Sequence, residues 1–454
     1  MSRTIKLKKG FDLNLIGKAE KKINETGLPD TYALKPSDFI GLSRPKLLVK
    51  EGDNVKAGSP ILFERGAEDA LITSPVSGEV VEIIRGDKRK VLEVKILGDK
   101  DVEFEAFNKY SSSDLSNLTA AEVISQLKSS GAWTQIIQRP YGILADLDKQ
   151  PKSIFISGFD SSPMAPDYSY TLQGEDQNFQ AGVNVLKKLT SGTIHLNIDG
   201  NGEVPQLFSQ VDGVQLNTIS GPHPAGNVGV QIHHLDPVNK GEIVWTVSPV
   251  GVAFIGKLFL EGKYDTSRLI AITGSQVKDP ADVKTYSGAC FDKLLAENVI
   301  GDHNRYISGN VLSGEGVGKS GYLGHYHNQI TVIPEGDEEE FFGWIKPSAK
   351  KLSYHRAFGL LSFLNGNKEF AVNTNTYGEH RNFVVTGSFE EVLPMDILPM
   401  YLFKAIMAED YEDMEALGIY ELIEEDVALC EFVDVSKNPI QEILREGIDL
   451  MKEG

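Results

Sequence analysis

The residues VKEGDNVKAGSP (Val49–Pro60) and SPVSGEV (Ser74–Val80) form the most informative part of this chain. Val76, Val80 and Ile83–Ile84 alternate with polar residues around Gly78 and Gly86. A period of two is typical of half-buried β-strands, and the glycines favour tight turns between them. The stretch therefore predicts a set of short β-hairpins.

These segments resemble a biotinyl- or lipoyl-type carrier domain, in which two β-hairpins pack face to face. In that fold, a lysine in the tight turn between the hairpins carries the cofactor. The matching turn is expected within ERGAEDA (Glu64–Ala70), which contains no lysine. We therefore expect a barrel-sandwich hybrid domain over residues 1–105 that keeps the carrier shape without covalent carrier chemistry.

Composition limits the possible classes of protein. The 454 residues suffice for about three or four domains, and 41% of them are hydrophobic, so sizeable cores can form. The formal net charge of −19 repels phosphate backbones, so nucleic acid is not an expected partner. Two cysteines, Cys290 and Cys430, exclude a disulfide framework and fit a reducing compartment.

No targeting or membrane-spanning segment is expected. The first ten residues carry charges without an apolar region after them. The longest uncharged run, Ile243–Gly256, contains Pro249 and Gly251 and is shorter than the roughly 20 apolar residues of a transmembrane helix.

Residues 106–150 are predicted to be a helical linker. Thr119 and Glu122 have the spacing of a capping box, in which each side chain binds the other residue's free backbone N–H. Val123–Leu127 then provides an apolar face, and Gly131 is a suitable end.

Residues 151–254 are predicted to form a Rossmann-like α/β domain. A strand at Ile154–Ile156, a helix around Phe179–Leu186 and a strand at Thr193–Ile198 follow one another. After the first strand, SGFDSSP (Ser157–Pro163) has one glycine where a dinucleotide fingerprint needs three. NAD binding by this chain is therefore not expected.

Residues 255–335 are rich in glycine and strand signals, and a small β-grasp (SLBB-like) domain is expected. GEGVGKS (Gly314–Ser320) superficially resembles a phosphate-binding loop. That motif needs a glycine where Ser313 stands and a helix afterwards. Gly321–Gly324 would break such a helix, and Gln329–Ile333 reads as a strand.

Residues 336–454 are predicted to be mainly helical. The last helix should start with Asn438 as N-cap and Pro439 in the first position. From Ala405 to Ser436 there are eleven carboxylates and no lysine or arginine. This run is either a solvated acidic face or a docking surface for a basic partner.

The sequence offers no catalytic, cofactor-binding or metal-binding set. His233 and His234 read as neighbours on a strand and would point to opposite faces. His325 and His327 have no cysteine or carboxylate close in sequence. Cys430 lacks the repeated C-x-x-C spacing of an iron–sulfur site.

Several motifs in a fixed order resemble the NqrA subunit family of bacterial Na⁺-translocating NADH:quinone oxidoreductases (Na⁺-NQR), over nearly the whole chain. The family is also similar to the RnfC subunit of the related Rnf complex. Besides the lysine-less domain, the resemblance rests on IKLKKGFDL (Ile5–Leu13), SGPHPAG (Ser220–Gly226), GKLFL (Gly256–Leu260), YLGHYH (Tyr322–His327), FGW (Phe342–Trp344) and EEDVALC (Glu424–Cys430). LCEFVDVSKNP (Leu429–Pro439) resembles a ferredoxin-type segment without its cluster ligands.

The resemblance implies a peripheral subunit at the cytoplasmic face of the bacterial inner membrane. It implies five partner subunits, some of them embedded in the membrane, and a complex that oxidises NADH, reduces ubiquinone or menaquinone and exports Na⁺. Flavins and an iron–sulfur centre are expected in the complex, and none bound by this chain. This chain alone is then not expected to hold a complete active site.

The resemblance also links this subunit with quinone binding. A quinone needs an apolar cleft and one or two hydrogen-bond donors. Phe39 and Trp133 are the candidate walls, and Arg139 or Tyr141 the candidate donor. Ordinary packing between domains is the other interpretation of these residues. The alternative function is a free-standing electron-transfer protein with its own flavin or iron–sulfur centre, which would absorb visible light.

Overall fold

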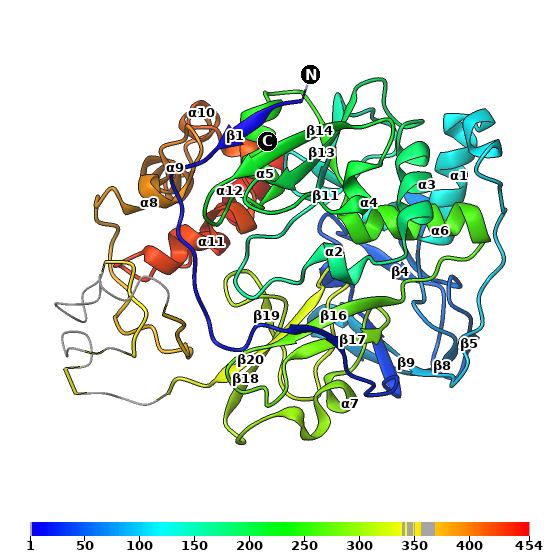
Figure 1. The fold of residues 1–454 in the computed structure, drawn as a ribbon, viewed down its shortest axis with the longest axis horizontal. Coiled ribbons are helices and arrows are strands. Elements are labelled where there is room, and N and C mark those ends of the chain that lie inside the picture. Colours follow the sequence, from blue (N-terminus) through cyan, green and yellow to red (C-terminus); the bar gives the residue numbers. More distant parts are fainter. Residues whose placement is uncertain (1, 338–340, 343–347, 349, 356–367, 454) are drawn as a thin grey trace.

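The computed structural model describes residues 2–337, 341, 342, 348, 350–355 and 368–453. The fold is the α+β multidomain architecture that the sequence predicts, with a barrel-sandwich region, an α/β region, a β-grasp-like sheet and a helical C-terminal region. Figure 1 shows the orange and red helices of the C-terminal region toward the left, and the cyan and green α/β region extending to the right.

The barrel-sandwich region consists of a four-stranded sheet and a three-stranded sheet that share one apolar core. The turn between β6 and β7 is Arg65–Gly66, inside the predicted segment. The strands are β3 (Thr31–Leu34), β4 (Pro45–Leu47), β5 (Asn54–Val55), β6 (Pro60–Glu64), β7 (Ala67–Thr73), β8 (Gly78–Arg85) and β9 (Val91–Gly98).

The α/β region is built on a seven-stranded sheet of order β1-β14-β13-β12-β15-β10-β11. The predicted strand–helix–strand unit is confirmed, since β12 and β13 are parallel and α3 connects them. Its strands are β10 (Ile137–Arg139), β11 (Ile143–Leu144), β12 (Ser153–Ser157), β13 (Thr193–Asp199), β14 (Gln215–Ser220) and β15 (Val244–Thr246). Its helices are α1 (Ala120–Ser130), α2 (Tyr168–Thr171), α3 (Asp176–Leu186), α4 (Gln206–Ser209), α5 (Val228–Leu235) and α6 (Pro249–Glu261).

Two local predictions for this region are confirmed, and one needs correction. Thr119 and Glu122 form the capping box of α1, and Gly131 ends the helix in the left-handed conformation. His233 and His234, however, lie in helix α5 and not on a strand. The apolar residues between them and Val228 recur at helical spacing, which outweighs the strand interpretation.

A six-stranded sheet of order β19-β18-β20-β16-β17-β2 forms the β-grasp-like region. Its elements are β16 (Arg268–Thr273), β17 (Ala281–Thr285), α7 (Phe291–Leu295), β18 (Asn304–Ser308), β19 (Glu315–Gly316) and β20 (Gln329–Pro334). The segment Gly314–Ser320 passes into β19 and a loop, and the strand predicted after it is β20. No helix N-terminus follows Lys319 to hold a phosphate.

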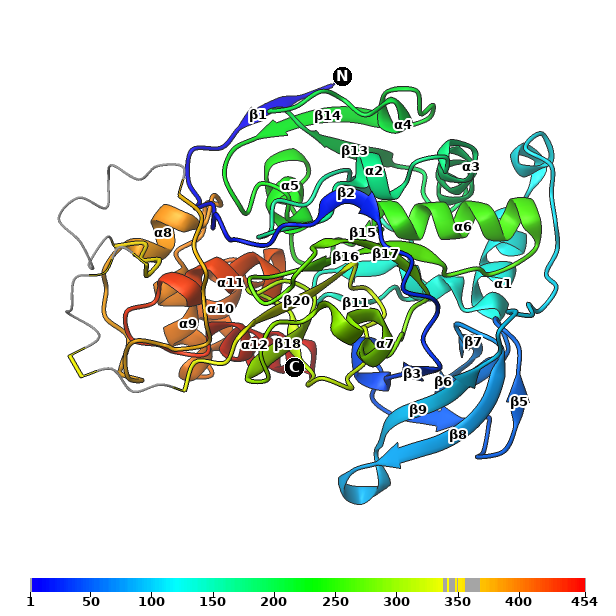
Figure 2. The same ribbon diagram turned by 60° about the horizontal axis from the view of Figure 1, so that its bottom comes forward.

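The N-terminal strap, residues 2–23, belongs to three regions at once (Figure 2). Its strand β1 (Thr4–Lys6) pairs with β14, and its strand β2 (Glu20–Ile23) pairs with β17. Between them, Leu13 and Leu15 are buried in the core of the C-terminal helices.

The described C-terminal helices are α8 (Ser388–Val392), α9 (Pro399–Met407), α10 (Tyr411–Ala416), α11 (Glu424–Val433) and α12 (Ile440–Glu453). Cys430 is fully buried among them, and burial raises the pKa of its thiol. Among the described residues, no helix has the length and apolar character to cross a membrane. The apolar run Ile243–Gly256 instead supplies β15 and the buried helix α6.

Candidate functional site

A cleft of about 750 Å³ lies where the barrel-sandwich, α/β, β-grasp and C-terminal regions meet. We call it the central cleft. Each region contributes to its wall, for example through Ile40, Thr246, Gln329 and Arg445. The volume is in the range of pockets that enclose a drug-sized ligand, roughly 300–1,000 Å³.

The topology of the α/β sheet explains why a cleft forms at this place. Strand β13 lies on one side of β12 and β15 on the other, so the chain changes direction between β12 and β15. Ser157 at the end of β12 and Thr246 at the end of β15 both line the central cleft. Open parallel sheets bind ligands at such switch points, outside the carboxyl ends of their strands.

Helix N-termini also open into the central cleft. Val228 begins α5, Pro249 begins α6 and Glu424 begins α11, and all three residues line it. The free backbone N–H groups of a helix start give it a partial positive charge. In α6, the Ser248 hydroxyl accepts one of them, from Gly251, at 3.0 Å.

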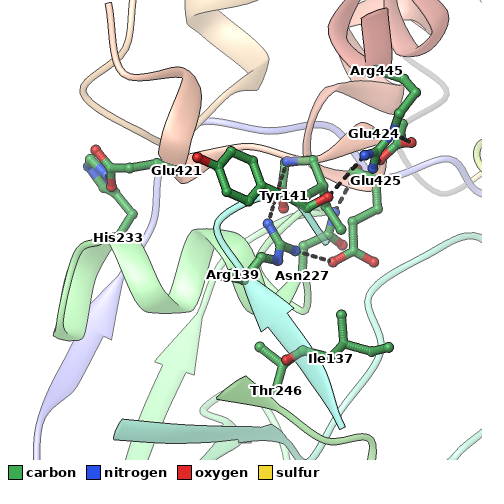
Figure 3. A network of polar contacts seen from close by, with 12 residues as sticks. Ile137, Arg139, Tyr141, Asn227, His233, Thr246, Glu421, Glu424, Glu425 and Arg445 are labelled. Carbon is green, nitrogen blue, oxygen red and sulfur yellow. Dashed lines mark hydrogen bonds and ion pairs between the residues drawn. The ribbon is translucent and has the colours of Figure 1, made fainter. Parts of the chain in front are cut away.

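Arg139 is the candidate residue that lies in the wall of the central cleft. Its guanidinium donates to Asp426 through Nη1 at 2.8 Å. It also donates to Glu425 through Nη2 at 2.9 Å (Figure 3). Burial lowers the pKa of Arg139, but the two carboxylates outweigh it and hold this pKa above its ordinary value. Arg139 and Asp426 are thus a buried ion pair that joins β10 to α11.

Glu425 forms the solvent-facing side of the same group. Burial and the neighbouring Asp426 carboxylate raise the pKa of Glu425, and Arg139 opposes that rise. The Glu425 side chain keeps 41% of its surface exposed, so solvent screening moderates the rise in its pKa. Asn227 fixes this corner further, because its amide donates to the Glu425 carbonyl at 2.8 Å.

Two buried polar groups in the wall of the central cleft have no partner within the described part of the chain. They are Nε of Arg139 and the hydroxyl of Ser162. An unpaired buried polar group costs about 1–3 kcal/mol, so such groups usually mark a place where water or a ligand binds. Sequence reasoning missed Ser162, although its position just after β12 is a recognisable signal for a ligand-facing residue.

Phe39 and Trp133 lie behind the wall of the central cleft. Phe39 is buried, with its ring centroid 4.8 Å from that of His325. Trp133 is buried, packs edge-on against Trp245, and donates its indole N–H to the Ala145 carbonyl at 2.8 Å. The residues beside them in sequence line the central cleft, namely Asp38, Ile40, Gln135 and Ile137.

Tyr141 lies at the edge of the central cleft, next to Gly142 in its wall. Its backbone has a positive φ of 83° and its carbonyl accepts from Arg445 Nη1 at 3.0 Å (Figure 3). Its ring packs edge-on against Tyr420 with 6.1 Å between the centroids. The structure therefore brings Arg139 and Tyr141 into one polar network, with Phe39 and Trp133 outside it.

His233 and His234 are held in polar contacts of other kinds. His233 Nδ1 lies 2.7 Å from Glu421, and His234 Nε2 lies 2.8 Å from the Pro394 carbonyl. Among the residues that the structure describes, no group of three or more His, Cys, Asp or Glu side chains is placed to hold a metal ion.

Comparison with known families matches three segments of the chain. Residues 5–99 match the NqrA N-terminal barrel-sandwich hybrid domain, residues 118–264 the NqrA second alpha/beta domain, and residues 269–319 the NQRA C-terminal domain. The NqrA subunit of the Na(+)-translocating NADH-quinone reductase of Pasteurella multocida is 38% identical over 454 residues, covering 99% of this chain and 100% of the relative. The chain belongs to the NqrA family.

Other members of the family match equally completely. The NqrA subunit from Glaesserella parasuis is 39% identical over 457 residues, and that from Neisseria meningitidis serogroup B is 37% identical over 454 residues. Both matches cover 99% of this chain and 100% of the relative. The family's second alpha/beta domain begins before α1, so it includes β10 and β11, which carry or flank Arg139.

Proposed function

We propose that this chain is the peripheral, cytoplasm-facing subunit of a respiratory sodium pump, and that its central cleft forms or shapes a quinone site. Family membership supports the first part, because the relatives are named as subunits of a Na(+)-translocating NADH-quinone reductase. In this proposal the other subunits, among them membrane-embedded ones, hold the flavins and the iron–sulfur centre, and the complex exports Na⁺.

The observation that carries the quinone proposal is the pair of unpartnered donors in the central cleft, Arg139 Nε and Ser162 Oγ. A quinone ring is apolar and has two carbonyl oxygens that only accept hydrogen bonds. Apolar side chains of the wall, such as Ile40, Ile137 and Phe159, can pack on the ring. A donor from β10 and another from the loop after β12 can then each serve a carbonyl.

The four candidate residues have different parts in this proposal. Arg139 donates directly, and Tyr141 helps to fix Arg445 beside it. Phe39 and Trp133 act from behind, because they hold the backbone of the residues that face the ligand.

The direct test is titration of the purified chain with a water-soluble ubiquinone or menaquinone analogue. Ser162→Ala removes one donor without leaving a charge unpaired, and we expect the dissociation constant to rise about tenfold. Ser209→Ala changes an exposed serine on α4 and should leave binding unaltered. Equal affinity in wild type and Ser162→Ala would contradict the assignment of this donor.

Trp133 tests whether the buried layer behind the central cleft contributes. Trp133→Ala should weaken binding of the analogue, but it also empties a core position. Trp133→Phe keeps an aromatic ring and creates a smaller cavity, but it removes the hydrogen bond to Ala145. Unchanged affinity in both variants would exclude this segment from the quinone site.

Co-purification with partner subunits and the visible absorption of the isolated chain test the subunit role itself. Purification of the chain from native membranes should recover the partner subunits of the pump. The isolated chain should be colourless and should release no flavin on denaturation. A bound flavin or an iron–sulfur spectrum would instead favour a free-standing electron-transfer protein.

A further inference from the structure

The outer side of α9 and α10 exposes a row of large apolar side chains. The exposed fractions of the residues are 51% for Leu398, 53% for Tyr401, 64% for Met407 and 44% for Tyr411. We call these four residues the outer row. Leu398 is the N-cap of α9, and Tyr401, Lys404 and Met407 follow it at three-residue steps, all of them exposed. Residues three apart on a helix are neighbours, so Lys404 lies between Tyr401 and Met407 in this row.

The inner side of the same helices already has its partners. Met400, Leu402, Phe403, Ile406 and Met414 are buried in the core of the C-terminal region. The outer row is therefore not part of that core. Several large apolar side chains gathered on one exposed surface are typical of an interaction site.

The charges around the outer row decide what kind of partner fits. Asp396, Glu409, Glu412 and Asp413 are exposed along the same segment, and Lys404 is the one cation between Leu398 and Tyr411. Among the described residues, none of these four carboxylates forms an ion pair. An acidic border around an apolar row favours a basic segment that also has an apolar side.

The rest of the acidic run is already used within the chain. Glu415 pairs with Lys240, Glu421 with His233, and Glu424 with Arg445, while Glu425 and Asp426 pair with Arg139. The two interpretations of the run therefore apply to different parts of it. The carboxylates of Glu415, Glu421, Glu425 and Asp426 contact the α/β region, and that of Glu424 pairs within the C-terminal region. Those of Glu409, Glu412 and Asp413 remain open to solvent.

We propose that the outer row and its acidic border dock a lysine- and arginine-rich amphipathic segment of another protein. Apolar side chains of that segment cover Tyr401 and Met407, and its cations approach Glu409 and Glu412. Figure 1 shows α9 and α10 at the edge of the molecule, on the side away from the β-grasp sheet. The inference rests on the proposed function only for the source of the segment, which is one of the partner subunits.

Photo-crosslinking in the assembled complex tests this proposal. A photoreactive phenylalanine analogue replaces Met407 in the cells that make the chain, and a second strain carries it at the exposed Ser209. Illumination of native membranes should join position 407 to a peptide of a partner subunit that is rich in lysine and arginine. Position 209 should give no such product.

Charge and apolar variants separate the two contributions. Glu409→Gln with Glu412→Gln should weaken retention of the partner in high-salt washes about threefold to tenfold, and Tyr401→Ser with Met407→Ser about tenfold or more. Glu446→Gln with Glu453→Gln alters two exposed carboxylates of α12 and is the matched control.

The possible failures are distinguishable. A chain that co-purifies with its partners, but whose position 407 joins lipid, a second copy of the chain, or an acidic segment, overturns this inference and leaves the proposed function standing. A chain that co-purifies with no partner overturns both.

Discussion

At the scale of single residues, Gly229 shows how tightly the buried ion pair is enclosed. It lies in α5, and a Cβ atom at this position would come against both carboxylate oxygens of Asp426. Asp426 cannot easily turn away, because it accepts from Arg139 and from the backbone N–H of Ile423. The glycine is thus needed for space and not for an unusual backbone angle.

Gly229→Ala should therefore destabilise the protein by about 1–3 kcal/mol, the usual cost of overpacking a buried site. Gly202→Ala is the control, since no atom lies within 4 Å of its Cβ position. Urea denaturation followed by tryptophan fluorescence measures both variants. A Gly229→Ala protein as stable as the control would mean that α5 and α11 separate without cost.

Buried histidines make the stability depend on pH. Burial lowers the pKa of His325 to about 3, of His327 to about 4 and of His195 to about 4, below the ordinary value near 6.5. The unfolded chain then binds more protons than the folded one between about pH 4 and 6.5. Stability is complete above pH 6.5 and falls as the pH decreases through this window.

We expect the free energy of unfolding to decrease by up to about 1.4 kcal/mol per pH unit for each of these histidines. Denaturation midpoints at pH 7.5, 6.0 and 5.0 measure this slope. His195→Gln should make the slope shallower, because His195 is a separate buried site in β13. An unchanged slope in this variant would show that His195 is accessible to protons in the folded state.

At the scale of elements, the N-terminal strap depends on the alternation of its side chains. Leu15 is buried among the C-terminal helices, whereas the adjacent Ile16 has 44% of its surface exposed. Leu15→Ala should cost about 2–4 kcal/mol and Ile16→Ala less than about 1 kcal/mol. Thermal unfolding of the two variants, which remove similar volumes at neighbouring positions, measures the difference. Equal effects would mean that the strap does not anchor the C-terminal region.

The same scale shows which elements the sequence could predict. Helix α1 was predictable because its start and end signals are local, at Thr119, Glu122 and Gly131. Strands β10 and β11, within the predicted linker, have only three and two residues, which is too short for any periodicity. The pairing of β1 with β14 joins residues such as Thr4 and Thr218, and no local pattern specifies that contact.

At the scale of the whole molecule, the candidate site is assembled from regions that are distant in sequence. Arg139 could be picked out as a cation beside aromatic residues, but its partner Asp426 lies 287 residues away. Nothing in the acidic run itself distinguishes Asp426 from the carboxylates that remain exposed. Ser162 lies in the loop Ser157–Pro163, which has too few glycines for a nucleotide motif. The position of this loop after β12 nevertheless places Ser162 in the wall of the central cleft.

The ion pair between Arg139 and Asp426 is a candidate for the contact that fixes the C-terminal region on the α/β region. Arg139→Met should destabilise the docking of α11 by about 3–5 kcal/mol, because it leaves the buried Asp426 carboxylate unpaired. Asp426→Asn should cost less, since Glu425 still neutralises Arg139. The double variant should cost less than the sum of the two, by about 1–3 kcal/mol, because no buried charge remains.

Amide hydrogen exchange of α11 in the wild type, the two single variants and the double variant measures this coupling directly. Lys240→Met and Glu415→Gln, made singly and together, give the matched double-mutant cycle. That pair also joins the α/β and C-terminal regions, but Lys240 is 68% exposed, so its coupling should stay below about 1 kcal/mol. If both cycles were additive within about 0.5 kcal/mol, docking of the C-terminal region would depend on apolar packing alone. A large coupling for Arg139 and Asp426 only would locate the electrostatic contribution in the wall of the central cleft, where ligand binding and domain docking would then share one arginine.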